Sequence, residues 1–464
     1  MPFATNQEYA WHELLDILQC PSCRRSFLFQ EIDQGLQHGR EYGLLKCGCT
    51  QYPVVDGIPI LTSSAVGAYE HTRGGVEYQG PSPEELTRLV LARRGLDALL
   101  RCIAFPIVFK RLLRIPPRRL WLSRRVLEIL AGLRRFRFRR RCMVSREVFA
   151  AEDWFDVFFR QHSPLRGDMF SYFFYRFSQP RHLATLQLTG YLPAGKKPLL
   201  DLACGFGHLG HSLAESPLAH AVVGVDRNFF GLWTAQYWIA PKNRFVCADA
   251  DKPLPFANDV FKAVLCSDAF HYFLHKDLVL QEITRCAPRQ PVLLARVGNK
   301  LAEPNEGFEL TPEAYAVVCG DPAWRIFGEN ELLRLYLSRN SAGRLAPRGT
   351  AKVEHEKWLY LVYPGEPPIS PQFQVGWPHA TGRLQINPIF KVSRIGDGNR
   401  RLQLRFPSQH YASENKEMTA YLPSEITITD GTYQQVKANV RSPEVESLIK
   451  QMVVIGVPER YTRA

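Results

Sequence analysis

One short segment constrains the fold of this chain more than any other. It spans residues 199–210 and runs LLDLACGFGHLG. An apolar run ends in a turn that contains Gly205 and Gly207, and a helical pattern follows. Glycine adopts a positive φ without a steric penalty and lets the backbone approach a ligand, because it has no Cβ atom. Strand, glycine-rich turn and helix in this order are typical of nucleotide-binding α/β folds, although G-x-G-x-x-G alone is a weak signal.

Apolar runs separated by helical windows continue from this segment to about residue 364. Such alternation is typical of a parallel sheet with helices on both faces. The sequence therefore predicts an α/β fold in which residues 196–364 form a Rossmann-like, doubly wound sheet. The predicted strands are 198–203, 221–226, 244–249, 263–268, 291–297 and 358–364.

Two acidic residues bear on the ligand of the glycine turn. Asp226 ends the second predicted strand, where an acid can bind the ribose hydroxyls of a dinucleotide or of S-adenosylmethionine. Asp201 ends the first strand, beside the turn, and its carboxylate would repel a pyrophosphate at the helix N-terminus. S-adenosylmethionine has no phosphate and carries a sulfonium and an ammonium group. The sequence therefore predicts S-adenosylmethionine as the cofactor.

The next segments strengthen this prediction. Residues 246–250 (VCADA), followed by LPF at 254–256 and DVF at 259–261, resemble class I S-adenosylmethionine-dependent methyltransferases of the ubiquinone-biosynthesis-like group. The resemblance implies that Asp249 and Ala250 contact the adenine and that 266–268 lines the methyl-transfer cleft. The predicted cofactor-binding residues are Asp201, Cys204, Gly205, Phe206, Gly207, Asp226, Asp249, Ala250 and Ser267.

The predicted catalytic residues follow the fourth strand and are Asp268, His271 and Tyr272. His271 could deprotonate an acceptor, because its unperturbed pKa lies near neutrality. The alternative is that His271 packs against or caps the next helix. Tyr272 is expected to form pocket wall. His208 and His211 are expected to face outward, without a ligand role.

Four cysteines near the N-terminus form a candidate metal site. Cys20 and Cys23 precede Cys47 and Cys49 by a segment with the pattern of a hairpin, and two thiolate pairs suit tetrahedral zinc. Four protein ligands would close the site, so zinc would be structural; buried or free thiols are the alternative. The segments LLDILQCPSC and LLKCGCTQYPVVDGIPIL resemble the zinc ribbon of the small subunit that activates tRNA, rRNA and protein methyltransferases.

The positive charge of the chain is concentrated in residues 91–146, which contain 17 Lys and Arg but only 2 Asp and Glu. Arginines alternate there with apolar residues at helical spacing. Three interpretations remain open: a helical insert packed on the enzyme core, an anionic membrane surface as partner, or RNA as partner. Protein partners cannot be predicted from the sequence.

The remaining segments complete the predicted organisation. Residues 1–65 form the zinc-ribbon-like domain, 66–150 a linker with the basic helical insert, 151–195 aromatic helices that cap the cleft, and 365–464 an α/β region without a readable function. The aromatic residues expected to roof a hydrophobic pocket are Phe158, Phe159, Tyr172, Phe173, Phe174 and Tyr175. No signal peptide or spanning segment is recognisable, so a cytoplasmic protein is expected, with association at a membrane surface as an alternative.

These features together predict a methyltransferase that acts on a small-molecule or lipid-like acceptor. The alternatives are a methyltransferase acting on tRNA or rRNA and a non-catalytic scaffold with the same fold. Methyl transfer is an in-line displacement, for which the protein mainly supplies proximity, orientation and, where needed, a base.

Overall fold

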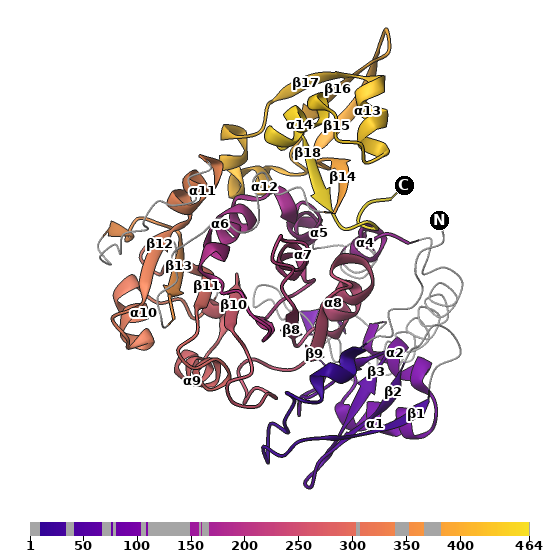
Figure 1. Ribbon diagram of the computed structural model, residues 1–464, viewed down its shortest axis with the longest axis vertical. Helices are drawn as coiled ribbons and strands as arrows, with labels where there is room; N and C mark the ends of the chain where they lie inside the picture. Colours follow the sequence, from indigo (N-terminus) through magenta and orange to yellow (C-terminus); the bar gives the residue numbers. More distant parts are fainter. Residues whose placement is uncertain are drawn as a thin grey trace, which may run out of the picture.

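The computed structural model describes residues 10–33, 41–66, 76–77, 80–103, 108–109, 149–156, 159, 167–302, 307–338, 352–365 and 382–463 (Figure 1). Most of the basic segment and Phe158 lie outside these residues. The three interpretations of the basic segment therefore stay predictions. None of the helices in the described ranges is long and apolar enough to cross a membrane.

A seven-stranded sheet forms the core of residues 196–364. Its order is β12-β13-β11-β10-β7-β8-β9, and β13 alone runs antiparallel to its neighbours. All six predicted strands are present, and β12 was not predicted. The strands are β7 (Leu199–Leu202), β8 (Val222–Asp226), β9 (Arg244–Cys247), β10 (Ala263–Ser267), β11 (Val292–Gly298), β12 (Arg325–Gly328) and β13 (Trp358–Tyr363).

Helices cover both faces of this sheet, because successive strand residues point to opposite sides. Leu199 belongs to one buried cluster and Leu200 to the other. The first face carries α6 (Pro180–Leu188), α7 (His208–Ala214), α8 (Phe229–Thr234) and α11 (Glu329–Leu337). The second face carries α9 (Lys276–Cys286) and α10 (Pro312–Cys319). The doubly wound arrangement is therefore as predicted.

The N-terminal region packs on the edge of this sheet. It contains β1 (Leu28–Asp33), β2 (Tyr42–Lys46), β3 (Gln51–Val55) and β4 (Ile58–Pro59), with α1 (Pro83–Leu91) and α2 (Gly95–Ile103) against them. Beyond β4, Ile60 bridges Cys247 in parallel, and the Leu61 amide donates to the Cys247 carbonyl at 2.8 Å. The N-terminal sheet is thus joined to the edge strand β9 by a single parallel bridge.

One buried side chain anchors this N-terminal region to α8 and the turn that follows. The carboxylate of Asp56 accepts hydrogen bonds from Trp233 Nε1 at 2.9 Å and from the Tyr237 hydroxyl at 3.1 Å. Asp56 adopts φ +53° and is 1% exposed. A buried carboxylate is tolerated only when donors satisfy it, so this turn and α8 are tightly coupled.

The C-terminal region is α/β, as predicted. Its strands are β14 (Arg383–Ile386) with β18 (Val454–Val457), and β15 (Phe390–Gly396), β16 (Asn399–Leu404) and β17 (Glu425–Thr429). Its helices are α12 (Gln409–Glu414), α13 (Asp430–Lys437) and α14 (Pro443–Lys450). In Figure 1 this region lies above α5 (Gly167–Phe174) and α6, and α12 contacts α5.

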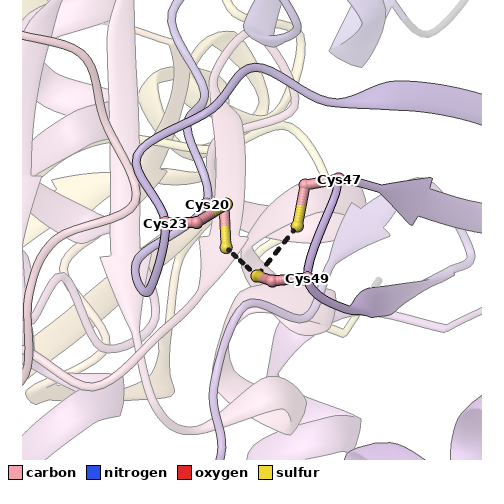
Figure 2. Close-up of side chains that lie close together, drawn as sticks. All are labelled: Cys20, Cys23, Cys47 and Cys49. Atoms are coloured by element: carbon pink, nitrogen blue, oxygen red, sulfur yellow. Dashed lines mark hydrogen bonds between the residues drawn. The ribbon is translucent and has the colours of Figure 1, made fainter.

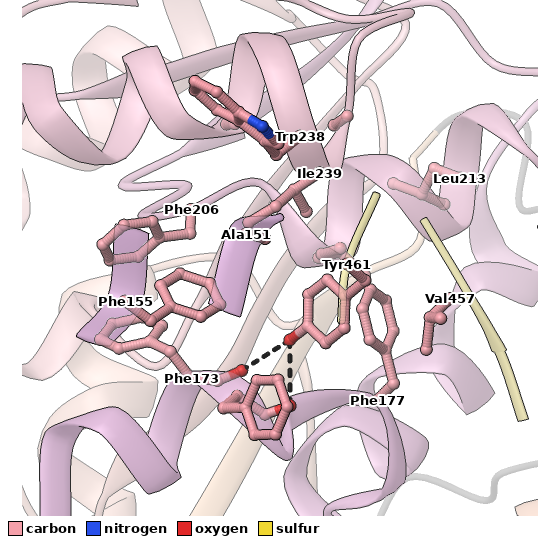
Figure 3. Packing of buried hydrophobic residues seen from close by; sticks show 14 of the residues in the cluster. Ala151, Phe155, Phe173, Phe177, Phe206, Leu213, Trp238, Ile239, Val457 and Tyr461 are labelled. Carbon is pink, nitrogen blue, oxygen red and sulfur yellow. Dashed lines mark hydrogen bonds between the residues drawn. The ribbon is translucent and has the colours of Figure 1, made fainter. Parts of the chain in front are cut away.

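An aromatic core joins the C-terminus to the sheet domain. Figure 3 shows the Tyr461 ring among Phe155, Phe173 and Phe177, with its hydroxyl directed at the backbone of α5. That hydroxyl lies 3.0 Å from the Phe173 carbonyl oxygen and 2.9 Å from His208 Nε2. The expected aromatic cap is thus largely a packed core, with α4 (Ala151–Phe155) as part of it.

The expectation that His208 and His211 face outward is wrong. Both are buried, and burial lowers the pKa of His211 to about 3. The reason is that α7 lies between the sheet and the C-terminal region, so this helix has no solvent-facing side. The periodicity of a single helix cannot show that a distant segment covers its outer face.

Candidate active site

A pocket of about 820 Å³ opens at the carboxyl edge of the parallel strands. It lies where the strand order reverses between β7 and β10, the place where open α/β sheets bind ligands. The glycine turn forms one end of the pocket, and a cluster of arginines and aromatic rings forms the other. We refer to these as the glycine-turn end and the arginine end.

Backbone geometry at the glycine-turn end requires the glycines. Gly205 has φ +57°, and its amide donates to Asp226 Oδ2 at 2.9 Å. Gly207 has φ +74°, and a Cβ atom there would lie 3.1 Å from the Cβ of Ala235. Gly205 lines the pocket, whereas Gly207 closes the turn behind it and is absent from the lining. The contribution of Gly207 is therefore to the shape of the turn.

Two carboxylates, the buried Asp201 and the half-buried Asp226, make the glycine-turn end electronegative. Desolvation and the charge of Asp226 raise the pKa of Asp201 to about 7, and Arg176 offsets this only in part. Desolvation also raises the pKa of Asp226, although the amides of Asn228 and Gly205 donate to it. Buried acids with raised pKa values are stabilised by a cation. The sulfonium and ammonium groups of S-adenosylmethionine fit this end, and a diphosphate does not.

The other predicted cofactor residues are also brought to this end. Those that line the pocket are Asp201, Cys204, Gly205, Phe206, Asp226, Asp249, Ala250 and Ser267. The ring of Phe206, however, packs into the aromatic core, with its centroid 4.6 Å from that of Phe173. Its side chain therefore helps position the turn. Asp251 and Arg227 join the lining without having been predicted.

Asp268 is the centre of a buried charge network at the arginine end. Its Oδ1 lies 2.6 Å from Arg296, and its Oδ2 lies 3.3 Å from Arg176 and 3.6 Å from Arg181. Burial alone would raise the pKa of Asp268, but the three guanidinium groups outweigh it and bring the pKa well below its ordinary value. Asp268 therefore stays ionised and positions arginines; it is too weak a base to accept a proton.

Strained backbone places Asp268 and Arg296 beside each other. Arg296 has φ +55° at a bulge in β11, where the register with β13 shifts between Leu294 and Val297. Asp268 has φ +63°, and its amide donates to the Ala295 carbonyl at 2.8 Å. A positive φ costs a residue other than glycine on the order of 1 kcal/mol, and such bulges redirect side chains near functional sites.

Most of the arginine end was missed by sequence analysis. The missed residues come from distant segments and include Arg176, Arg181, Arg296, Lys357, Trp358, Tyr411 and Glu414. One signal was available, because Arg296 is the single charged residue in the apolar strand 291–297. Tyr172 and Phe173 line this end as expected of the aromatic cap, and Tyr272 forms wall. The roof is more charged than the hydrophobic pocket that was predicted.

The structure gives no support to His271 as a general base. It is 1% exposed and is absent from the pocket lining, and burial lowers its pKa to about 4. Its carbonyl accepts from the Phe308 amide at 2.8 Å, which ties η7 (Phe270–Tyr272) to the following loop. His271 therefore packs behind the pocket wall, which was the alternative interpretation.

Comparisons with known proteins agree with this geometry. Residues 199–289 match the family model of the methyltransferase domain. The chain carries a methyltransferase domain. This match confirms the methyltransferase expected from the sequence. A search of curated proteins found no match.

Solved structures with similar regions were also found. One is a TehB-like S-adenosylmethionine-dependent methyltransferase from Corynebacterium glutamicum, at 16% identity and TM-score 0.29, covering 40% of this chain and 88% of the other. Another is a chain from the complex between the Haloferax volcanii Trm112 methyltransferase activator and a methyltransferase, at 18% identity and TM-score 0.30, covering 41% and 91%.

The four predicted metal ligands meet beside the methyltransferase domain. All four sulfur atoms lie within 4.8 Å of one another, and Figure 2 shows Cys20, Cys47 and Cys49 converging. The Sγ atoms of Cys20 and Cys49 are 3.6 Å apart, and those of Cys47 and Cys49 are 3.3 Å apart. Sulfurs bound to tetrahedral zinc at about 2.3 Å are roughly 3.8 Å apart. The cluster is compatible with zinc.

Proposed function

We propose that this protein transfers the methyl group of S-adenosylmethionine to a small-molecule acceptor, as the resemblance to the ubiquinone-biosynthesis-like group suggests. One observation carries the proposal: a single pocket connects the electronegative glycine-turn end to the arginine end. Sites for small molecules have volumes of about 300–1,000 Å³. A volume of about 820 Å³ is therefore in keeping with a cofactor and a small second substrate together.

The glycine-turn end supplies the cofactor contacts in this proposal. Asp226 would bind the ribose hydroxyls. Asp201 would face the ammonium group, because a nearby cation would stabilise the ionised form of this buried carboxylate. Asp249 and Ala250 would contact the adenine. When bound, S-adenosylmethionine supplies an electrophilic methyl group. The residues of the glycine-turn end would hold the cofactor, with Ser267 between it and the arginine end.

The arginine end would hold the acceptor in line with the methyl group. Its walls come from α5, α6, β11, β13 and α12, that is, from three of the predicted regions. Buried side chains from several elements would fix the orientation of the acceptor, which is most of what methyl transfer requires. Asp268 would contribute by fixing the arginines and not as a proton acceptor.

A transfer experiment tests the proposal. Purified protein is incubated with S-adenosylmethionine labelled in the methyl group, together with either a small-metabolite extract or total RNA. We expect label in the small-molecule fraction, and none with Asp226→Ala. Label in RNA would instead support the tRNA or rRNA alternative. Absence of cofactor binding by folded protein would support the scaffold alternative.

We propose further that the four cysteines bind a structural zinc ion. Four thiolates would complete its coordination and leave no position for a substrate. Metal analysis of purified protein is expected to find about one zinc ion per chain, and Cys47→Ser is expected to lower this content. Cys319→Ser, a partly buried cysteine on α10, is the matched control and should retain the metal. Metal-free wild-type protein that is folded and active would contradict the proposal.

A further inference from the structure

We infer that the methyl acceptor carries an oxyanion, a carboxylate or a phosphate monoester, which binds Arg176 and Arg181 at the arginine end. This inference rests on the proposed function, because it names the substrate class of the same pocket.

Arg176 and Arg181 share one carboxylate oxygen between them. Their Nη1 atoms lie 3.3 Å and 3.6 Å from Asp268 Oδ2, whereas Arg296 takes Oδ1 at 2.6 Å. A guanidinium has five N–H donors, and its fork geometry suits bidentate binding of carboxylate or phosphate. Arg176 also contacts the Tyr172 hydroxyl, but among the described residues these contacts leave most of the donors of both arginines available, and both arginines line the pocket.

The charges at this end do not cancel. With histidines neutral, the described cations are Arg176, Arg181, Arg296 and Lys357, and the carboxylates paired with them are Asp268, Glu329 and Glu414. These paired groups leave one positive charge in excess, and Asp201, which also interacts with Arg176, compensates it only in part because its own pKa is raised to about 7. The Arg176 and Arg181 side chains are only 11% and 6% exposed. Burying an uncompensated charge is costly, and a bound anion would remove that cost.

Aromatic rings fix the planes of these arginines. The guanidinium carbons of Arg176 and Arg181 lie 4.9 Å and 4.7 Å from the centroid of the Tyr172 ring. Arg296 lies 3.6 Å over the ring of Trp358. Stacking of this kind preorganises a planar guanidinium for bidentate contacts, which an ammonium group cannot reproduce. The arrangement thus favours an oxyanion over a neutral polar group.

The backbone strain at Asp268 and Arg296 also supports an anion-binding role for the arginine end. Both residues take a positive φ at the pocket edge, and together they form the 2.6 Å ion pair that anchors the network. Strain at a site is retained where function requires the geometry. Since Asp268 directly follows Ser267 at the glycine-turn end, the arginines lie next to the cofactor region. A bound oxyanion would therefore position the acceptor close to the transferable methyl group.

The pocket is consequently of opposite sign at its two ends. Carboxylates dominate the glycine-turn end, where a cationic cofactor fits, and guanidinium groups dominate the arginine end. Polynucleotide phosphates would also satisfy arginines, but these arginines are buried side chains within a pocket and do not form an exposed track. The observations therefore favour a small anion.

Titration calorimetry with protein saturated by S-adenosylhomocysteine tests the inference. The probes are benzoate and phenyl phosphate, with benzamide as the neutral control, because aromatic rings line this end. We expect one or both anions to bind at least about tenfold more tightly than benzamide, as charge-assisted contacts to arginine predict. The stronger of the two anions identifies carboxylate or phosphate as the preferred group.

Variants locate the binding site. Arg181→Gln is expected to weaken anion binding by about tenfold or more, and Arg181→Lys by less, because charge persists while the fork is lost. Arg401→Gln removes an exposed arginine paired with Glu425 in the C-terminal region and should change nothing. Affinity for S-adenosylhomocysteine and the melting temperature are measured for every variant, so that misfolding is recognised.

The outcomes separate the inference from the function on which it rests. Equal binding of benzoate and benzamide, or anion binding that survives Arg181→Gln, would overturn the inference. The inference would also be overturned if an oligoribonucleotide displaced the bound anions and were itself methylated. Failure to bind S-adenosylhomocysteine would overturn the proposed function instead, and anion binding is then measured with the cofactor-free protein.

Discussion

Two buried carboxylates in one pocket, Asp201 and Asp268, are shifted in opposite directions. Burial and Asp226 raise the pKa of Asp201 to about 7, whereas Arg296, Arg176 and Arg181 outweigh burial and bring that of Asp268 well below its ordinary value. The opposite pKa shifts show that the two ends of the pocket have opposite electrostatic character. At the glycine-turn end the protein leaves a negative site for the cation of a ligand. At the arginine end it supplies its own cations in excess of its anions.

Replacing each acid with asparagine should give the largest contrast. Asp268→Asn removes the carboxylate that Arg176 and Arg181 share and leaves Arg296 paired with Glu329 alone, so we expect the free energy of unfolding to fall by about 3–5 kcal/mol. Asp201→Asn removes a buried carboxylate that no arginine neutralises fully, so the melting temperature at pH 8 should stay the same or rise. Thermal unfolding of both variants beside the wild type measures this.

A third variant serves as the control for removing a negative charge. Asp259 pairs with Lys197 at 2.8 Å on the surface, with about half of each side chain exposed. Asp259→Asn should therefore cost about 1 kcal/mol or less. If Asp201→Asn destabilised the protein as much as Asp268→Asn, the assignment of opposite electrostatic character to the two ends would be wrong.

Cofactor affinity should depend next most strongly on Asp226. Asp226→Ala removes the acid expected to bind the ribose and also the acceptor of the Gly205 amide. We expect affinity for S-adenosylhomocysteine to fall about a hundredfold, about 2.7 kcal/mol, since hydrogen bonds to charged groups contribute about 1.5–3 kcal/mol each. Calorimetry measures it, and Asp226→Asn, which keeps an oxygen acceptor, should lose less. Unchanged affinity in both variants would place the ribose elsewhere.

The pKa of Asp201 predicts how cofactor binding depends on pH. An acid with a pKa of about 7 must lose its proton before it can face an ammonium group. Affinity for the cofactor should therefore rise roughly twentyfold between about pH 5.5 and 7.5. Above the pKa of Asp201 it should level off. Asp201→Asn should flatten this dependence. Affinity that fell with rising pH would contradict the assignment of the cation to this end.

The two ends also differ in how far the sequence predicts them. The glycine-turn end is built by short strand–turn segments in chain order, each of which places its own residue at the sheet edge. Gly205, Asp226 and Asp249 were therefore predicted from local pattern and resemblance, and all three line the pocket. Local motifs predict a site well when local backbone geometry determines it.

The arginine end is assembled by tertiary packing. Arg181 on α6 and Arg296 at a bulge meet at Asp268 because α6 packs on the sheet, and Tyr411 on α12 joins them because the C-terminal region folds over the sheet domain. No local periodicity encodes a contact between residues more than a hundred positions apart. The same packing explains the error at His208, which the C-terminal residue Tyr461 covers. The alignment of Asp268 with three arginines was unpredictable for this reason, although the residue itself was selected.

The smallest expected effect concerns Tyr172, whose hydroxyl donates to Asp268 and whose ring lies against Arg176 and Arg181. Tyr172→Phe keeps the ring and removes one donor from a carboxylate that retains three guanidinium groups. We expect a loss of about 1 kcal/mol in the free energy of unfolding, measured in urea, and a change of less than about threefold in benzoate affinity. Tyr172→Leu also removes the ring, so it should weaken benzoate binding further. Loss of methyl transfer in Tyr172→Phe with stability and binding intact would instead assign the hydroxyl to the chemistry.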